Sequence, residues 1–139
     1  MTDKKPDVAS WLARGASLPF AYLTTTGRET GRPHRIEIWF AVHEGRIYLM
    51  SGGRDRSDWV RNVRADGHVT FDLGGEARAG IARIIDPDSA EDALARDLLV
   101  RKYATPRDPL VDWKRRSLPV VIEFPDVDAA PTLRKGVSR

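Results

Sequence analysis

The chain has 139 residues, of which 41% are hydrophobic and 31% charged, and its formal net charge is +3 at pH 7. This length corresponds to one domain with one core, and without any apolar run of roughly 18 residues we expect a cytoplasmic protein with no membrane span. The sequence has no cysteine, which excludes disulfides, thiolate nucleophiles and Cys-ligated metal centres, so redox chemistry would need a bound cofactor.

The predicted elements begin with a short amphipathic helix, because Val8, Trp11 and Leu12 recur at helical intervals before Gly15. From Phe20 onwards the pattern is typical of strands, which are rich in aromatic and β-branched residues or alternate between apolar and polar ones. Glycine-containing turns separate several of these strands. The predicted strands are residues 20–26, 35–42, 47–51, 68–73, 76–86 and 118–124.

Further helices are predicted between and after these strands. Ser57 is placed to cap a short helix, and a longer helix opens at Asp86 or Asp88 with Pro87 in its first turn. Residues 110–116 indicate one more helical turn. Sequential hairpins, too few strands for two full sheets and a late returning strand predict a small closed or partly open antiparallel barrel rather than a parallel βαβ fold.

The turn over residues 24–35, with the sequence TTTGRETGRPHR, combines two glycines with three arginines. Uncovered backbone N–H groups and guanidinium groups together hold phosphate without a metal. Residues 28–64 contain eight arginines and five acidic residues, whereas the remainder of the chain is balanced at 15 basic and 15 acidic. This turn is therefore a candidate anion site, although an ordinary hairpin loop kept soluble by its charges explains this composition equally well.

A second loop, SGGRDRSDW at residues 51–59, again joins two glycines to two arginines and leads into a helix N-terminus, which favours anions. We expect both loops to lie at ends of the same hairpin-paired strands and to face one ligand. Trp59 or Trp39 would then be available to stack on a planar ring.

Other kinds of site find less support. The serines lack a nucleophile-elbow context, and the three histidines are scattered without metal-ligand spacing, so no metal is expected. There is no P-loop pattern. Asp86 and Asp88 are explained as helix caps. A net charge of +3 is small for phosphate-backbone contacts, so no nucleic-acid partner is expected.

Three ordered segments resemble the deazaflavin (F420)-dependent nitroreductase family, which belongs to the flavin/deazaflavin oxidoreductases with a split β-barrel fold. They are YLTTTGRETGRPHRIEI, then SGG followed by DWVRNVRAD, then the stretch from Trp113 to Pro125 that ends in LPVVIEFP. The resemblance spans roughly residues 22–125. It implies one split-barrel, FMN-binding-like domain, which we place at residues 1–125, followed by a polar tail at residues 126–139.

The resemblance also implies the cofactor: coenzyme F420, a hydride carrier with a phosphodiester and an oligoglutamate tail. The expected enzyme transfers a hydride from F420H2 to an electron-poor small molecule, namely a quinone, nitroaromatic or activated enone. Tyr103 is the candidate proton donor, and a monomer or homodimer is expected. The residues expected to bind the cofactor are Arg28, Arg32, His34, Arg35, Ile36, Glu37, Ser51, Gly52, Gly53, Arg54, Arg56, Trp59 and Asn62.

The chain departs from the family pattern at Glu29 and Gly52, where relatives commonly have basic residues, and at about Ala104, Arg107 and Leu110, where relatives have tyrosines in the substrate pocket. Two alternatives stay open. One is a split-barrel reductase that binds FMN instead of F420, and the other is a carrier that binds F420 without turnover.

Overall fold

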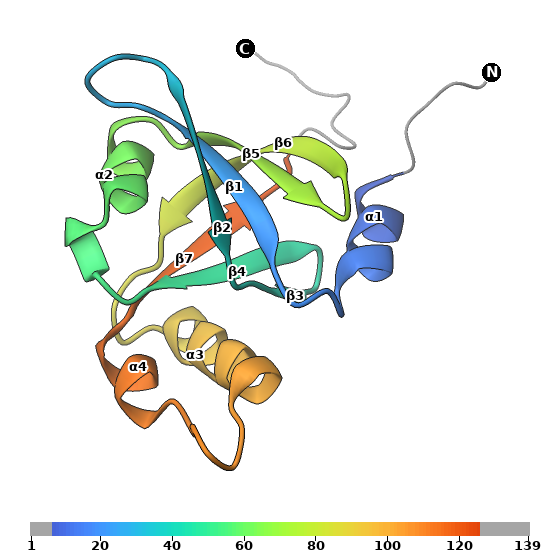
Figure 1. Ribbon diagram of the computed structural model, residues 1–139, viewed down its shortest axis with the longest axis vertical. Helices are drawn as coiled ribbons and strands as arrows, with labels where there is room; N and C mark the ends of the chain where they lie inside the picture. Colours follow the sequence, from blue (N-terminus) through green and yellow to red (C-terminus); the bar gives the residue numbers. More distant parts are fainter. Residues whose placement is uncertain (1–6, 126–139) are drawn as a thin grey trace.

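The computed structural model describes residues 7–125, which form one curled antiparallel sheet of seven strands with helices around it (Figure 1). The strand order is β2-β1-β5-β6-β7-β4-β3. The strands are β1 (Ala21–Thr26), β2 (Pro33–Ile38), β3 (Ala41–His43), β4 (Arg46–Ser51), β5 (His68–Leu73), β6 (Glu76–Ile84) and β7 (Leu118–Glu123). The helices are α1 (Val8–Gly15), the 3-10 helix η1 (Arg54–Arg56), α2 (Asp58–Ala65), α3 (Ala90–Tyr103) and α4 (Val111–Arg116).

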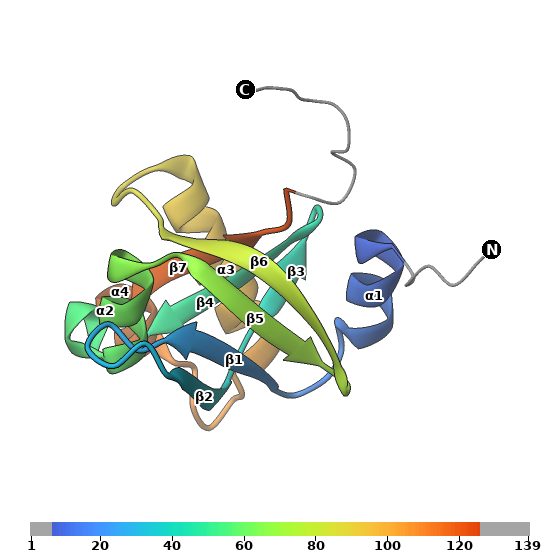
Figure 2. The ribbon, with the colours of Figure 1, turned by 90° about the horizontal axis from the view of Figure 1, so that it is seen from above.

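The sheet wraps around one main core, and α1 covers an end of it (Figure 2). Trp11 and Leu12 of α1 are almost fully buried in the same cluster as Leu23 of β1 and Phe71 of β5. Since alternate strand residues face opposite sides of a sheet, one side of each of these strands supplies the core. This arrangement confirms the predicted split barrel.

A second, smaller core lies between the outside of the sheet and α3. Tyr48 and Met50 of β4 and Val121 of β7 pack there against Ala95 and Leu99 of α3. Five of the six residues of β4 are consequently buried, so the side chains of this strand are buried on both faces of the sheet and do not alternate between buried and exposed positions. This second core holds α3 beside the sheet.

The strand predicted at residues 35–42 is divided in the structure, which is a correction. Strands β2 and β3 are separated by Trp39 and Phe40. The backbone N–H of Phe40 donates to the Tyr103 hydroxyl at 3.1 Å, and its carbonyl accepts from Lys102 Nζ at 3.0 Å. Because these backbone groups bind side chains of α3 instead of a neighbouring strand, the ladder stops here.

The cap of α3 also differs from the prediction. Ser89, and neither Asp86 nor Asp88, is the N-cap, and its hydroxyl accepts a hydrogen bond from the backbone N–H of Asp92 at 3.0 Å. Asp88 has φ of +63° and lies in the turn before the helix. The predicted tail at residues 126–139 lies outside the described residues. No helix within residues 7–125 is long and apolar enough to cross a membrane.

Candidate functional site

The β1–β2 loop is tightly folded, and its two glycines have different roles. Gly27 donates from its N–H to the carbonyl of Arg32 at 2.7 Å, and a Cβ on Gly27 would come within 2.6 Å of the His34 ring. Gly31 has φ of +77°, a region that glycine adopts without strain. Gly27 therefore lets the two arms of the loop lie closer together than a side chain would allow, and Gly31 allows the backbone to turn.

Asn62 of α2 anchors this loop. Its side chain is 2% exposed, and its Oδ1 accepts from both the backbone N–H and the Nη1 of Arg28, at 3.1 and 2.9 Å. Its Nδ2 donates to Thr25 Oγ1 at 3.0 Å. A buried amide with both ends satisfied fixes its neighbours firmly. Sequence reasoning placed Asn62 among the cofactor ligands, and the structure shows it holding Arg28.

Arg28 is also paired with an acidic residue of the same helix. Its Nη2 lies 3.2 Å from Oδ1 of Asp58, in the first turn of α2. Sequence reasoning missed Asp58 as a partner of this loop. Its position in the first turn of a predicted helix, where carboxylates are favoured, was the available signal.

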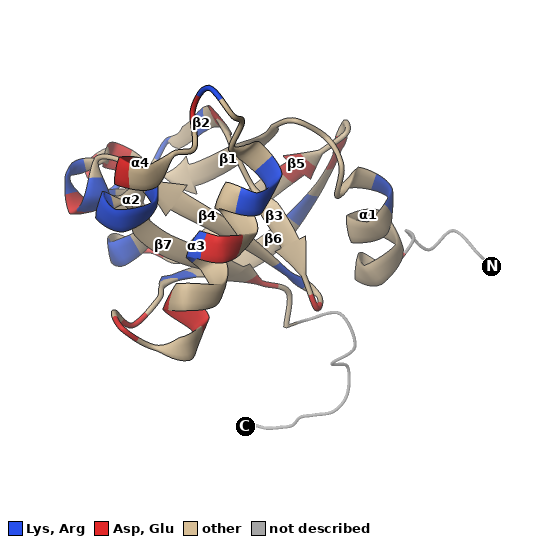
Figure 3. Ribbon diagram, turned by 90° about the horizontal axis from the view of Figure 1, so that it is seen from below, with Lys and Arg blue, Asp and Glu red and all other residues tan. Residues whose placement is uncertain are grey.

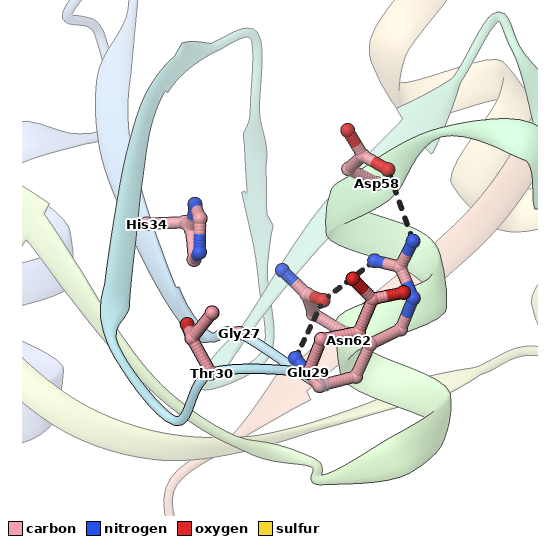
Figure 4. A pocket seen from close by; sticks show the side chains of 7 residues that line it. Gly27, Glu29, Thr30, His34, Asp58 and Asn62 are labelled. Atoms are coloured by element: carbon pink, nitrogen blue, oxygen red, sulfur yellow. Dashed lines mark hydrogen bonds and ion pairs between the residues drawn. The ribbon is translucent and has the colours of Figure 1, made fainter.

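These residues line a small pocket between the loop and α2 (Figure 4). Its volume is about 170 Å³, and Glu29, Asp58 and Asn62 lie together across from His34. One arginine thus faces two carboxylates. The lining residues are Gly27, Arg28, Glu29, Thr30, His34, Asp58 and Asn62.

The second predicted loop is held by serine hydroxyls. The Oγ of Ser51 donates to the carbonyl of Arg54 at 3.0 Å and lies 2.6 Å from the Oγ of Ser57. Ser57 is the N-cap of α2, as predicted, but its hydroxyl makes no capping bond because it is engaged with Ser51. A Cβ on Gly53 would come within 2.7 Å of the Ser57 hydroxyl, so a side chain here would displace that hydroxyl from its position beside Ser51.

The two loops meet by a route that differs from the expected one. They were expected at ends of the same paired strands, but β1 and β4 are not neighbours in the sheet. Helix α2, which follows the second loop directly, brings the two together because Asn62 and Asp58 bind Arg28 of the first loop. In Figure 1 the β1–β2 loop extends beside α2.

The cations of the second loop lie apart from the pocket. Nη1 of Arg54 donates to the carbonyl of Arg116 at 2.6 Å. Arg56 of this loop is exposed and forms no ion pair within residues 7–125, and the same holds for Arg32 of the β1–β2 loop. Acidic segments lie among the basic ones where α2 and α4 lie (Figure 3). The two loops expected to bind an anion therefore lie in a surface that carries charges of both signs.

Strand β2 divides the predicted ligands between two faces of the sheet. His34 and Ile36 pair with Thr25 and Leu23, which are buried, and so face inward. Arg35 and Glu37 face the other side. There Arg35 lies 3.4 Å from Asp72 and 4.2 Å from the ring centre of Tyr22.

At the far end of β2 three aromatic rings form a cluster. Trp39 is 41% exposed and stacks in parallel on Tyr103 with ring centres 4.2 Å apart. Trp113 contacts it edge to face at 5.5 Å. A Cβ on Gly52 would lie 3.5 Å from Trp113, so the cluster borders the second loop. Trp59, the alternative stacking residue, packs instead against the main core.

Tyr103, the candidate proton donor, is bound to backbone groups. Its hydroxyl lies 2.9 Å from the carbonyl oxygen of Pro19 and 3.1 Å from that of Phe40, and it accepts from the Phe40 N–H. Burial raises the pKa of Tyr103. The neighbouring Lys102 donates to the carbonyls of Ala16 and Phe40, and burial lowers its pKa to about 8. Sequence reasoning did not identify Lys102.

Residues 8–125 match the model of the F420H(2)-dependent quinone reductase family. Among solved structures, an F420-H2 dependent reductase (FDR-A) is 22% identical to this chain and has a TM-score of 0.63. The match covers 76% of this chain and 95% of the reductase chain. A conserved hypothetical protein of Mycobacterium tuberculosis is 22% identical with a TM-score of 0.65, covering 97% and 98%. The heme storage protein HutZ of Vibrio cholerae is 10% identical with a TM-score of 0.63, covering 84% and 87%. These likenesses show a shared fold.

Proposed function

The chain belongs to the F420H(2)-dependent quinone reductase family of oxidoreductases, which use reduced F420, and we propose that it transfers a hydride from F420H2 to an electron-poor acceptor. Quinones are the first acceptor class to test, followed by nitroaromatics and activated enones. The observation that carries this proposal is the pairing of a polar pocket and an aromatic cluster at opposite ends of β2.

The residues present fit a long ligand that is flat at one end and anionic at the other. His34 at the pocket and Trp39 in the cluster are five residues apart, about 17 Å in extended chain. Between them the inward side chains are Ile36 and Ile38, which are apolar and half-buried. F420 has a planar deazaflavin at one end and a phosphodiester with carboxylates at the other.

We assign the anionic end to the pocket and the ring to the apolar part of β2. Arg28 is the one arginine of the pocket, and Asn62 positions it. Arg35 and Glu37 face the other side of the sheet, so we propose no direct contact between them and the cofactor. The residues proposed to bind or shape the cofactor site are Arg28, Arg32, His34, Ile36, Ser51, Gly52, Gly53, Arg54, Arg56, Trp59 and Asn62.

The deazaflavin, when bound, supplies the hydride chemistry. The protein's contribution is to orient the ring, to exclude water with the aromatic cluster and to hold a proton donor near the acceptor. The hydroxyl of Tyr103 would have to leave its backbone partners to act as that donor. Its present bonds favour a structural role.

A carrier without turnover is the second candidate, since the Tyr103 hydroxyl is engaged by backbone. Purified protein titrated with F420 and with FMN tests the cofactor: we expect saturable binding of F420 at lower concentration than FMN. Reduced F420 mixed with menadione tests turnover, and we expect faster oxidation with the protein than without it. Binding with no acceleration for several acceptors would favour the carrier, and absence of F420 binding would refute both.

A further inference from the structure

Glu29 lines the pocket without an ionic partner of its own. Glu29 is exposed and forms no ion pair within residues 7–125. The other carboxylate of the pocket, Asp58, is 84% exposed and pairs with Arg28. Glu29 thus adds a carboxylate, with no ion pair among residues 7–125, to the pocket where the anionic end of the ligand is expected (Figure 4).

Arg28 does not offset this charge fully, because its guanidinium is already bound. Two of its nitrogens contact Asn62 and Asp58, at 2.9 and 3.2 Å. A ligand carboxylate that binds Arg28 must share it with Asp58 and approach Glu29 at the same time. Like charges that share one pocket repel, and low ionic strength strengthens the repulsion.

We propose that Glu29 is a specificity-determining residue that makes this chain discriminate against long oligoglutamate tails on F420. The proposal rests on the function proposed above, because it requires the anionic end of F420 to reach this pocket. Each added glutamate brings another carboxylate, so lengthening the tail adds repulsion here. Tail-free deazaflavin riboside carries neither the phosphodiester nor the tail and avoids Glu29.

The test measures affinity by titrating the cofactor's own fluorescence, with three probes: the tail-free riboside, short-tailed F420 and long-tailed F420. The variants are Glu29→Gln and Glu29→Lys. The matched control is Glu37→Gln, which removes an exposed glutamate on the other face of β2. Glu29 lies in an exposed loop, so these variants are expected to fold, and a thermal melt verifies this.

We expect Glu29→Gln to tighten binding of long-tailed F420 by about two- to fivefold, the size of an exposed charge interaction. Glu29→Lys should tighten it further. The gain should be smaller for short-tailed F420, absent for the riboside, absent in Glu37→Gln and reduced at high salt.

Two results overturn the inference. In the first, F420 binds but the Glu29 variants change affinity equally for all three probes, or not at all. Glu29 then does not discriminate between tail lengths, and the proposed cofactor is unaffected. If no deazaflavin binds to any form of the protein, the proposed function fails with it.

Discussion

Asn62 receives two hydrogen bonds from Arg28 on one side-chain oxygen, one from the backbone and one from the guanidinium, at 3.1 and 2.9 Å. The two residues are 34 positions apart, in the β1–β2 loop and in α2. A single buried amide therefore sets both the position of the loop and the direction of its arginine.

Replacing Asn62 by alanine should cost stability and cofactor affinity together. The change leaves the Arg28 N–H and the Thr25 hydroxyl without their partner, which costs about 1–3 kcal/mol when such groups are buried. Urea unfolding and F420 titration measure the two effects. Thr25→Val is the control, because it removes one bond of Asn62 and leaves the contact with Arg28. Equal losses of affinity in both variants would contradict the anchoring role.

Arg35→Ala should leave cofactor affinity unchanged, whereas Arg28→Ala should weaken it about tenfold. Arg35 contacts Asp72 and the Tyr22 ring on the outer face, so its loss should cost at most about 1 kcal/mol of stability. The loss of affinity in Arg28→Ala should be larger at low salt. Parallel F420 titrations of both variants at two ionic strengths provide the measurement. Equal weakening would mean that the outer face of β2 also binds the cofactor.

Lys102 should make the protein more stable at alkaline pH. Burial lowers the native pKa of Lys102 from 10.5 to about 8, so between these values the unfolded chain binds more protons than the native state. Stability rises with pH under that condition. The side chain is partly exposed, which reduces the size of the effect.

The measurement is the difference in unfolding free energy between wild type and Lys102→Met from pH 7.5 to 10.5. As pH rises, the unfolding free energy of wild type should increase relative to that of Lys102→Met. Lys114→Met, which removes a lysine paired with Asp97 on the surface, serves as the control. The same slope in both variants would show that Lys102 is not specifically perturbed.

Much of the fold follows from local patterns, because alternation and glycine turns are visible in the sequence. The break at Phe40 is not, since Phe40 continues the alternation of Ile36 and Ile38. Its cause is the side chain of Tyr103, 63 residues away, which no local pattern contains.

The candidate site was predictable as a set of loops but not as a set of contacts. The glycine and arginine content marks both loops, whereas the pairing of Arg28 with Asp58 joins elements 30 residues apart. The division of the β2 side chains between two faces could be predicted from odd and even residue numbers, because residues 34 and 36 of a strand face one side and residues 35 and 37 the other. This alternation places Arg35 on the face opposite to His34 and therefore away from the pocket.

Tyr103→Phe distinguishes a structural from a catalytic role for this hydroxyl. The ring remains to stack on Trp39, but the Phe40 N–H loses its acceptor. We expect a loss of about 1–3 kcal/mol in the free energy of unfolding, as for other hydrogen-bond partners removed from buried groups. The turnover number should change little, because the hydroxyl is committed to the backbone of Pro19 and Phe40.

General acid catalysis contributes about 10²–10⁴-fold, so a true proton donor would give a very different result. In that case kcat would fall by such a factor with KM nearly unchanged, and the alkaline limb of the pH profile would disappear. Steady-state kinetics across pH, together with urea unfolding of the same variant, separate the two. Tyr22→Phe is the control for losing a tyrosine hydroxyl, since Tyr22 lies on the outer face beside Arg35. The backbone bonds of Tyr103 predict the structural outcome, in which the fixed phenol ring holds Trp39 at the end of β2.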